Sequence, residues 1–165
     1  MTQDIRLEAR IGTLLNQHGQ TVSTAESCTG GLIAHRLSNI PGSSAYFYGG
    51  IVSYDNSIKS DVLHVPEDLL KTVGAVSEPV ARSMALNVRQ LMRTDYGLSV
   101  TGIAGPGGGT DQKPVGLTYI GLALPDGEVI VHQYVWSGDR EANKTSSAEA
   151  ALQMLFSHLE GMTST

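Results

Sequence analysis

The segment 115–136, VGLTYIGLALPDGEVIVHQYVW, decides the fold. Two runs of apolar and β-branched residues flank Pro125, Asp126 and Gly127, which together favour a tight turn. The pattern predicts a β-hairpin, whose two strands run antiparallel. Because helical and strand-like segments alternate in the chain before it, this late hairpin predicts a mixed sheet.

Upstream of the hairpin, the spacing of apolar residues predicts alternating helices and strands. The first helix is expected to open near Leu7 and to stop at Gly19, and the last should run from Asp139 to Gly161. Between them the sequence predicts strands at 21–25, 46–54 and 97–103, and helices at 32–40 and from Ser77 onward. We therefore expect an α/β fold, a three-layer α/β/α sandwich with a mixed β-sheet, in a single domain over residues 1–165.

The composition argues against several classes of protein. The chain of 165 residues has a formal net charge of −5 and 11 scattered lysines and arginines, unlike a nonspecific nucleic-acid binder. No apolar run approaches the roughly 20 residues of a membrane helix, and the opening MTQDIRLEAR lacks the apolar core of a signal peptide. We expect a cytoplasmic protein with neither nucleic acid nor membrane as partner. No metal site is predicted, because the five histidines lack ligand spacing: His18, His35, His64, His132 and His158.

The stretch 24–31, TAESCTGG, lies between a predicted strand and a predicted helix. In one interpretation Ser27 is an N-cap, whose hydroxyl accepts a backbone N–H of the helix. In the other it is a nucleophile, and free N–H groups of Thr29, Gly30 and Gly31 form an oxyanion hole that a substrate carbonyl can approach. The GxSxG motif of a nucleophile elbow is absent, so that motif does not decide between the two.

Cys28, the only cysteine of the chain, is a rival nucleophile. A helix N-terminus lowers the pKa of a thiol and so favours the reactive thiolate. The alternative is a small buried side chain without chemistry. No neighbour in the sequence supplies a partner for Cys28, so both interpretations stay open.

Lys59 is the candidate base for a serine nucleophile, because no histidine or acid shows a recognisable triad order. A strand is predicted to end near Tyr54, and Asp55 or Asn56 can cap a short helix with Lys59 in its first turn. A cation there opposes the helix dipole, which lowers its pKa and favours the neutral amine that a base requires. The alternative is a solvated surface lysine. Tyr54 either orients an amine or the substrate, or merely packs.

A glycine-rich loop, GIAGPGGGTDQKPVG, occupies residues 102–116 after a strand that contains Thr101. A proline follows its lysine, which excludes a Walker A loop. Arg140, near the start of the last helix, is a candidate phosphate clamp or else a surface arginine. The loop is either a generic connection or an anion site beside the Thr101 hydroxyl, made by three glycine N–H groups: Gly105, Gly107 and Gly108.

Five motifs together resemble one known family, in the same order and spacing over about residues 5–160: TAESCTGG, PGSSAYFYGGIVSYDNSIK, GAVSEPVA, GIAGPGGGTDQKPVG and SGDRE. The chain resembles the nicotinamide-nucleotide amidase family, to which the C-terminal domain of the competence/damage-inducible protein CinA belongs. The resemblance implies one CinA C-terminal-like amidase domain that works alone, without the additional amino-terminal domain of full-length CinA proteins.

The resemblance also implies a reaction, in which the carboxamide of nicotinamide mononucleotide is hydrolysed to nicotinic acid mononucleotide and ammonia for pyridine nucleotide salvage. Members are serine amidohydrolases with a serine and lysine pair, which corresponds to Ser27 and Lys59. Tyr54 and Thr101 match further active-site positions. No cofactor is implied, and the partner is a small nucleotide whose phosphate is expected against the glycine-rich loop and Arg140.

Two other functions stay open beside this one. The chain can be a noncatalytic nucleotide-binding regulatory module, or an amidase for another pyridine or nucleoside amide. The presence of both Ser27 and Lys59 argues against the noncatalytic module, because such a module is free to lose either residue. We also expect a homo-oligomer, with a dimer favoured, since small α/β amidases with apolar strand faces often dimerise.

Overall fold

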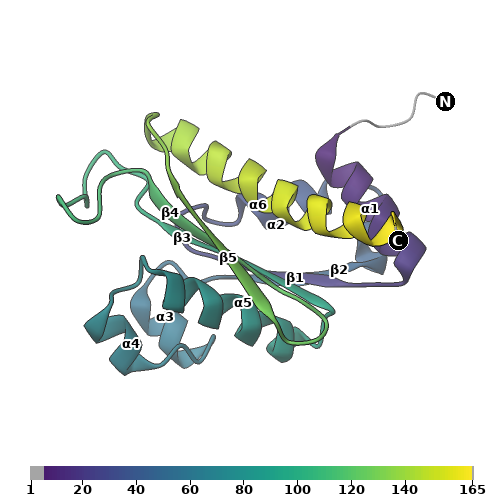
Figure 1. The fold of residues 1–165 in the computed structure, drawn as a ribbon, viewed down its shortest axis with the longest axis horizontal. Coiled ribbons are helices and arrows are strands. Elements are labelled where there is room, and N and C mark those ends of the chain that lie inside the picture. Colours follow the sequence, from purple (N-terminus) through teal and green to yellow (C-terminus); the bar gives the residue numbers. More distant parts are fainter. Residues whose placement is uncertain (1–5, 165) are drawn as a thin grey trace.

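The structure is a computed structural model that describes residues 6–164. A five-stranded sheet forms the middle of three layers, with α1, α2 and α6 on one face and α3, α4 and α5 on the other (Figure 1). The three-layer α/β/α sandwich with a mixed sheet is thereby confirmed. Residues 1–5, which belong to the opening stretch used to argue against a signal peptide, lie outside the described residues.

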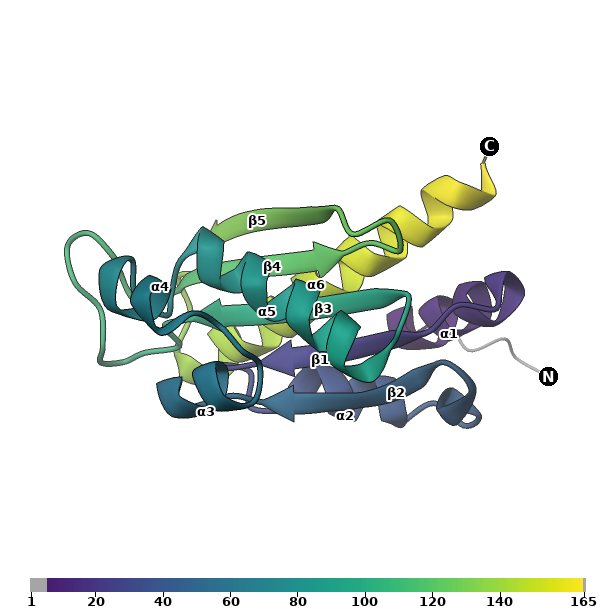
Figure 2. The ribbon, with the colours of Figure 1, turned by 90° about the horizontal axis from the view of Figure 1, so that it is seen from below.

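The strands lie in the order β2-β1-β3-β4-β5, as Figure 2 shows from the side of α5. Strand β1 pairs in parallel with β2 and with β3, whereas β3, β4 and β5 pair antiparallel. The predicted hairpin is confirmed as β4 and β5, whose turn is closed by the Gly127 N–H donating to the Leu124 carbonyl. The bounds of the strands are β1 Val22–Glu26, β2 Phe47–Val52, β3 Tyr96–Gly102, β4 Leu117–Ala123 and β5 Val129–Val135.

The helices follow the predicted signals, with differences at their ends. Gly19 ends α1 in the left-handed conformation, and the Asp139 carboxylate caps α6 by accepting the Ala142 N–H. Helix α6 runs past Gly161, because a single glycine inside a helix costs only about 1 kcal/mol. Helix α4 and a short 3-10 turn at Ser43–Ala45 were not predicted. The bounds are α1 Leu7–His18, α2 Leu32–Ser38, α3 Asn56–Asp61, α4 Glu67–Thr72, α5 Glu78–Met92 and α6 Arg140–Thr163.

Apolar side chains fill both spaces between the sheet and its helices. On one face Leu98 and Ile120 pack with Leu152 of α6, and on the other Ala25 packs with Met84 of α5. Each large apolar side chain buried in this way stabilises the fold by about 1.5–3 kcal/mol. The strands are therefore held firmly on both sides, and the loops at their ends start from fixed positions.

None of the helices formed by residues 6–164 combines the length and the apolar character needed to cross a bilayer.

Candidate active site

The candidate site lies where the parallel strands β1, β2 and β3 end. In the sheet, Glu26 of β1 is level with Val52 of β2 and with Val100 of β3. The pairing continues one step further, because the Ser27 N–H donates to the Val100 carbonyl and the Ser53 N–H donates to the Glu26 carbonyl. Because parallel strands share their carboxyl edge, Ser27 is brought beside the segments that carry Lys59 and Thr101.

Glu26 anchors the turn that carries Ser27. Its buried carboxylate accepts the Thr29 hydroxyl at 2.6 Å and the N–H groups of Ile33 and Ala34 at 2.9 and 3.0 Å. These two N–H groups belong to the first turn of α2, where helix donors lack partners within the helix. A carboxylate from the preceding strand therefore fastens the turn to the helix.

Ser27 is thus not the N-cap of α2. Gly31 occupies that position with a φ of 102°. Because glycine has no side chain, the N-cap residue offers no side-chain acceptor to the N–H groups of the helix. The longer Glu26 side chain takes the donors that a capping serine would have taken. Glu26 was not predicted to matter, although a buried-strand position followed by a helix makes an acid there a usable signal.

Lys59 lies beside Ser27 in the interior. Its Nζ atom lies 3.0 Å from the Ser27 Oγ atom and donates to the Ser53 carbonyl at 2.6 Å, and the residue is 1% exposed. The prediction of a short capped helix is confirmed, since Asp55 caps α3 by accepting the Ser57 N–H. Lys59 lies in the last turn of this helix rather than in its first.

Burial lowers the pKa of Lys59 below its ordinary value of 10.5, against the opposing influences of Asp55 and Cys28. A charged amine loses its hydration inside the protein, so the neutral form is favoured. The direction agrees with the sequence analysis, but the main cause is desolvation rather than the helix dipole. Burial therefore favours the neutral form of an amine that lies in contact with a serine hydroxyl.

Burial has the opposite effect on the thiol of Cys28, whose pKa it raises. The residue is 6% exposed, and this burial raises the pKa to about 11. The nearby lysines Lys144 and Lys59 only partly offset this rise. The thiol therefore stays protonated at neutral pH, which leaves Ser27 as the better-activated neighbour of the amine.

The backbone of the turn offers donors for an oxyanion, but not every one that was predicted. The Gly30 N–H donates to the Ser27 carbonyl at 3.1 Å and so is already used. Among residues 6–164, the N–H groups of Thr29 and Gly31 donate to no protein acceptor. Two of the three predicted donors are therefore unused within the described residues, and all three residues line a cavity of about 680 Å³ that shares Arg140 with the cavity lined by Ser27.

A cavity of about 210 Å³ joins the predicted side chains: Ser27, Lys59, Tyr54, Thr101 and Arg140 all line it, together with Asn56. The Tyr54 hydroxyl accepts from Arg140 Nη2 at 2.7 Å. The Thr101 hydroxyl donates to the Ala75 carbonyl at 2.9 Å, which fixes the segment that closes the cavity. Tyr54, Arg140 and Thr101 thus line the same cavity as Ser27 and Lys59.

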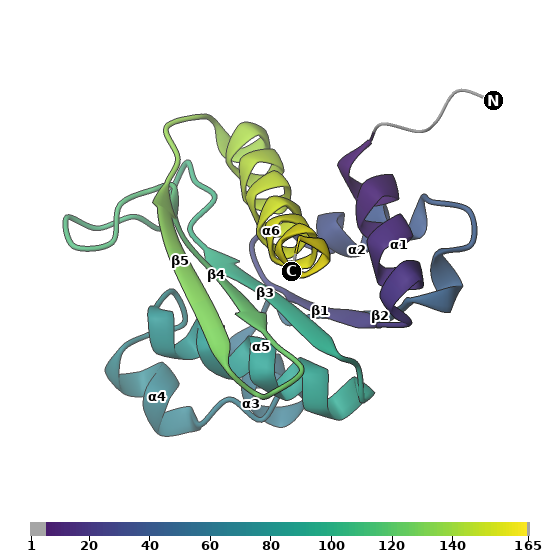
Figure 3. The same ribbon diagram turned by 45° about the vertical axis from the view of Figure 1, so that its right-hand side comes forward.

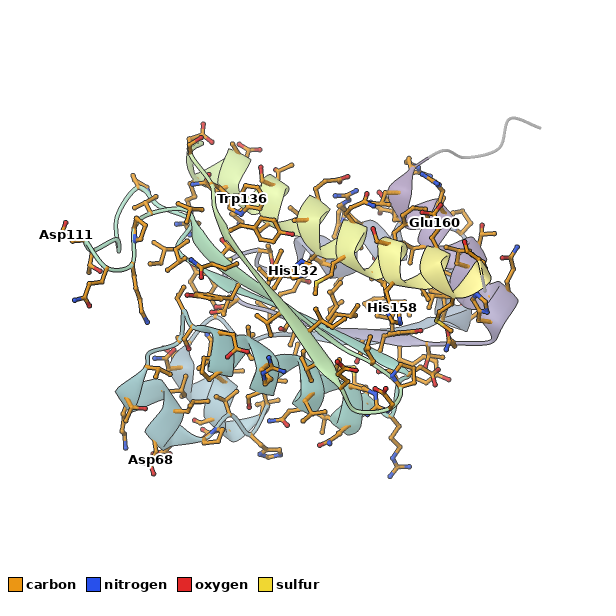
Figure 4. The ribbon with its side chains drawn as sticks, in the orientation of Figure 1. Asp68, Asp111, His132, Trp136, His158 and Glu160 are labelled. Carbon is orange, nitrogen blue, oxygen red and sulfur yellow. The ribbon has the colours of Figure 1, made fainter. Side chains whose placement is uncertain are left out.

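The glycine-rich loop is placed differently from the expectation. The Gly105 carbonyl, an acceptor, receives Arg140 Nη1 at 2.7 Å. Gly107 and Gly108 are exposed and line none of the cavities around Arg140. The loop projects beyond the sheet between β3 and β4 (Figure 3), and Figure 4 shows Asp111 far out on it. The structure therefore does not bring Gly107 and Gly108 to Ser27.

A second cavity, of about 850 Å³, lies between strands β4 and β5 and helix α6. It is lined by His132 and Trp136, labelled in Figure 4, and by apolar side chains such as Ile130. None of the side chains around Ser27 lines it. Within residues 6–164, no three His, Cys, Asp or Glu side chains are grouped so that they could hold a metal ion.

Comparisons with known proteins agree with the fold. The sequence profile described as "CinA C-terminal domain" matches residues 4–159. A putative competence-damage inducible protein of Halothermothrix orenii is 50% identical over 154 residues, which cover 93% of this chain and 37% of that protein. A CinA-like protein of Gloeothece citriformis is 53% identical over 90% of this chain and 36% of its own length. The chain therefore spans little more than a third of these two relatives.

Solved structures give the same result. The competence/damage inducible protein CihA from Agrobacterium tumefaciens has a TM-score of 0.90 and 42% identity, with 93% of both chains covered. A CinA superfamily protein from Klebsiella pneumoniae has a TM-score of 0.90 and 30% identity, with 94% of this chain and 96% of the other covered.

Proposed function

The chain belongs to the CinA C-terminal domain family, and on this premise we propose that residues 1–165 act as a single amidase domain. The substrate is nicotinamide mononucleotide, and the products are nicotinic acid mononucleotide and ammonia. Ser27 is the nucleophile and Lys59 is the base. The protein would then serve pyridine nucleotide salvage.

One observation carries this proposal: a buried amine with a lowered pKa lies 3.0 Å from a serine hydroxyl. A serine is a weak nucleophile unless a base removes its proton. A neutral lysine has a lone pair for that proton, whereas a charged lysine has none. The pair therefore has the geometry that amide cleavage requires, and burial shifts the pKa of the amine in the direction that favours a base.

In the proposed mechanism, the neutral amine of Lys59 takes the Ser27 proton while the Ser27 oxygen attacks the carboxamide carbon. The negative charge that develops on the carboxamide oxygen is stabilised by the N–H groups of Thr29 and Gly31. The protonated amine then gives its proton to the departing nitrogen, which leaves as ammonia and forms an acyl ester on Ser27. Water attacks this ester by the same route, with Lys59 again as base, and releases the carboxylate product.

The other side chains of the cavity support this assignment. Tyr54 and Arg140 hold one another through a hydrogen bond that involves a charged guanidinium, which is stronger than one between neutral groups. Arg140 is exposed to solvent and lines the cavity, where it can contact a negatively charged substrate. An anionic substrate with an amide at its far end is therefore favoured over a neutral amide.

A noncatalytic module is the competing function, and ammonia release decides between the two. We expect the purified protein to release ammonia from nicotinamide mononucleotide faster than from nicotinamide or its riboside, and Ser27→Ala to abolish the release. If the protein hydrolysed another pyridine or nucleoside amide but not nicotinamide mononucleotide, that other amide would be its substrate. No release from any pyridine amide would favour the noncatalytic module. The homodimer also stays a prediction, which sedimentation equilibrium can test.

A further inference from the structure

Lys144 of α6 is a half-buried cation. Among residues 6–164, Lys59, Lys71 and Lys113 each donate to an oxygen of the protein, whereas Lys144 makes neither a hydrogen bond nor an ion pair. Its Nζ atom lies 3.7 Å from the point that a Cβ atom on Gly30 would occupy. A free ammonium group therefore lies against the turn that carries Ser27.

This ammonium group faces a cavity of its own, of about 680 Å³. Six of the lining residues matter here: Gly30, Gly31, His35, Arg140, Glu141 and Lys144. Arg140 also lines the cavity that contains Ser27 and Lys59, so the two cavities adjoin along its side chain. Since Gly30 and Gly31 have no side chains, the turn presents only backbone to Lys144 at these two positions.

The charges around the two sides of Arg140 differ. On the side of Lys144, the two cations Lys144 and Arg140 outnumber the single carboxylate of Glu141. On the other side, a cavity of about 580 Å³ is lined by Asp139 and Glu141 with Arg140 as the one cation. The Gly105 carbonyl also points at Arg140 from the glycine-rich loop. An anion is therefore favoured on the side of Lys144 and disfavoured on the side of the loop.

We propose that Lys144 and Arg140 bind the phosphate monoester of the substrate in the cavity between α6 and the Gly30–Gly31 turn. The proposal rests on the proposed function and replaces the glycine-rich loop as the expected phosphate site. Both side chains extend from α6, since residues four apart lie on one face of a helix. The amide end then reaches Ser27 while the phosphate end stays on the far side of Arg140.

The kinetic test uses Lys144→Met, with Lys71→Met on α4 as the matched control because Lys71 is exposed and pairs only with Glu67. We expect Lys144→Met to raise KM for nicotinamide mononucleotide by about 10- to 100-fold, since a hydrogen bond to a charged group is lost, with little change in kcat. The KM for nicotinamide riboside, which has no phosphate, should not change. Lys144→Arg should keep most of the affinity. An unchanged KM for the nucleotide, or an equal rise for the riboside, would overturn the proposal.

A binding test separates this proposal from the proposed function. Calorimetric titration with ribose 5-phosphate at low ionic strength needs no turnover. We expect the wild type and Lys71→Met to bind it, and Lys144→Met to bind it at least about 10-fold more weakly. Binding that is absent from the wild type, or equal in all three proteins, would overturn the phosphate site. If the wild type binds the probe but releases no ammonia from any pyridine amide, the phosphate site stands and the amidase fails.

Discussion

The Nζ atom of Lys59 lies 3.0 Å from the Oγ atom of Ser27, although 32 positions separate the two residues in the chain. Lys59 is held from its other side by the carbonyl of Ser53, which follows β2 directly. The amine is therefore positioned beside the hydroxyl by helix α3, which carries Lys59, and by the carbonyl at the end of strand β2. This alignment is the basis of the first two predictions.

Ser27→Ala should lower kcat by at least about a thousandfold while the fold stays intact, because the attacking oxygen is removed. Cys28→Ala should keep most of the activity and lose some stability, since it only trims a buried side chain. Rates of ammonia release measure the activity of the two variants, and circular dichroism checks that both keep the fold. If Cys28→Ala lost the activity and Ser27→Ala kept it, Cys28 rather than Ser27 would be the nucleophile.

The pH profile should report the titration of Lys59. Only the neutral amine acts as a base, so kcat/KM should rise with pH and level off above the pKa of Lys59 in the free enzyme. Because burial lowers that pKa, the midpoint should fall below 10.5. Lys59→Met should remove this rise together with at least about a thousandfold of the activity, whereas Lys71→Met should keep both. A profile that is flat across neutral and alkaline pH in the wild type would contradict a lysine base.

Glu26→Gln should loosen the turn that carries Ser27. The amide nitrogen of glutamine cannot accept a hydrogen bond, so one of the donors around the buried carboxylate loses its partner. We expect the free energy of unfolding to fall by about 1–3 kcal/mol and kcat to fall with it. Glu149→Gln removes a carboxylate from an exposed ion pair with Arg36, and should cost less than about 1 kcal/mol.

Urea denaturation of the two glutamine variants measures these losses. Equal losses in the two variants, or a Glu26→Gln protein with the stability and the kcat of the wild type, would show that Glu26 does not hold the turn.

Tyr54→Phe should affect substrate binding rather than stability. The ring is 60% exposed, so the loss of its hydroxyl leaves the core untouched, but Arg140 loses an acceptor. We expect KM for the nucleotide to rise by about 3- to 10-fold with a smaller change in kcat. Tyr48→Phe, on a ring that is 58% exposed on β2, is the matched control and should change neither.

A double-mutant cycle with Arg140→Ala completes this prediction, because two residues that act through one contact are not additive. If Tyr54→Phe raised KM by the same factor in the Arg140→Ala background, the hydrogen bond between the two side chains would not be the cause.

The sequence by itself predicted most of the helices and strands of this fold and their order along the chain. Apolar spacing located α1, α5 and α6, and the turn residues at 125–127 located the hairpin of β4 and β5. These signals are local, because helix and strand periodicity and turn conformation depend on residues a few positions apart. Where a signal was weak, as for the six-residue helix α4, it was missed. Gly161 did not end α6, because one glycine inside a helix costs only about 1 kcal/mol.

Only the tertiary structure decided which of the candidate side chains meet. The parallel register of β1 with β2 and β3 brings Ser27, Lys59 and Thr101 to one edge of the sheet, and the capped helix α3 turns Lys59 inward. Burial then lowers the pKa of Lys59 and raises that of Cys28, an effect that depends on the surroundings of each side chain and on nothing in its immediate sequence. For the same reason the sequence pointed to the glycine-rich loop and Arg140 for the phosphate, whereas the fold places the Lys144 ammonium group, which has no hydrogen bond or ion pair among residues 6–164, against the Gly30–Gly31 turn.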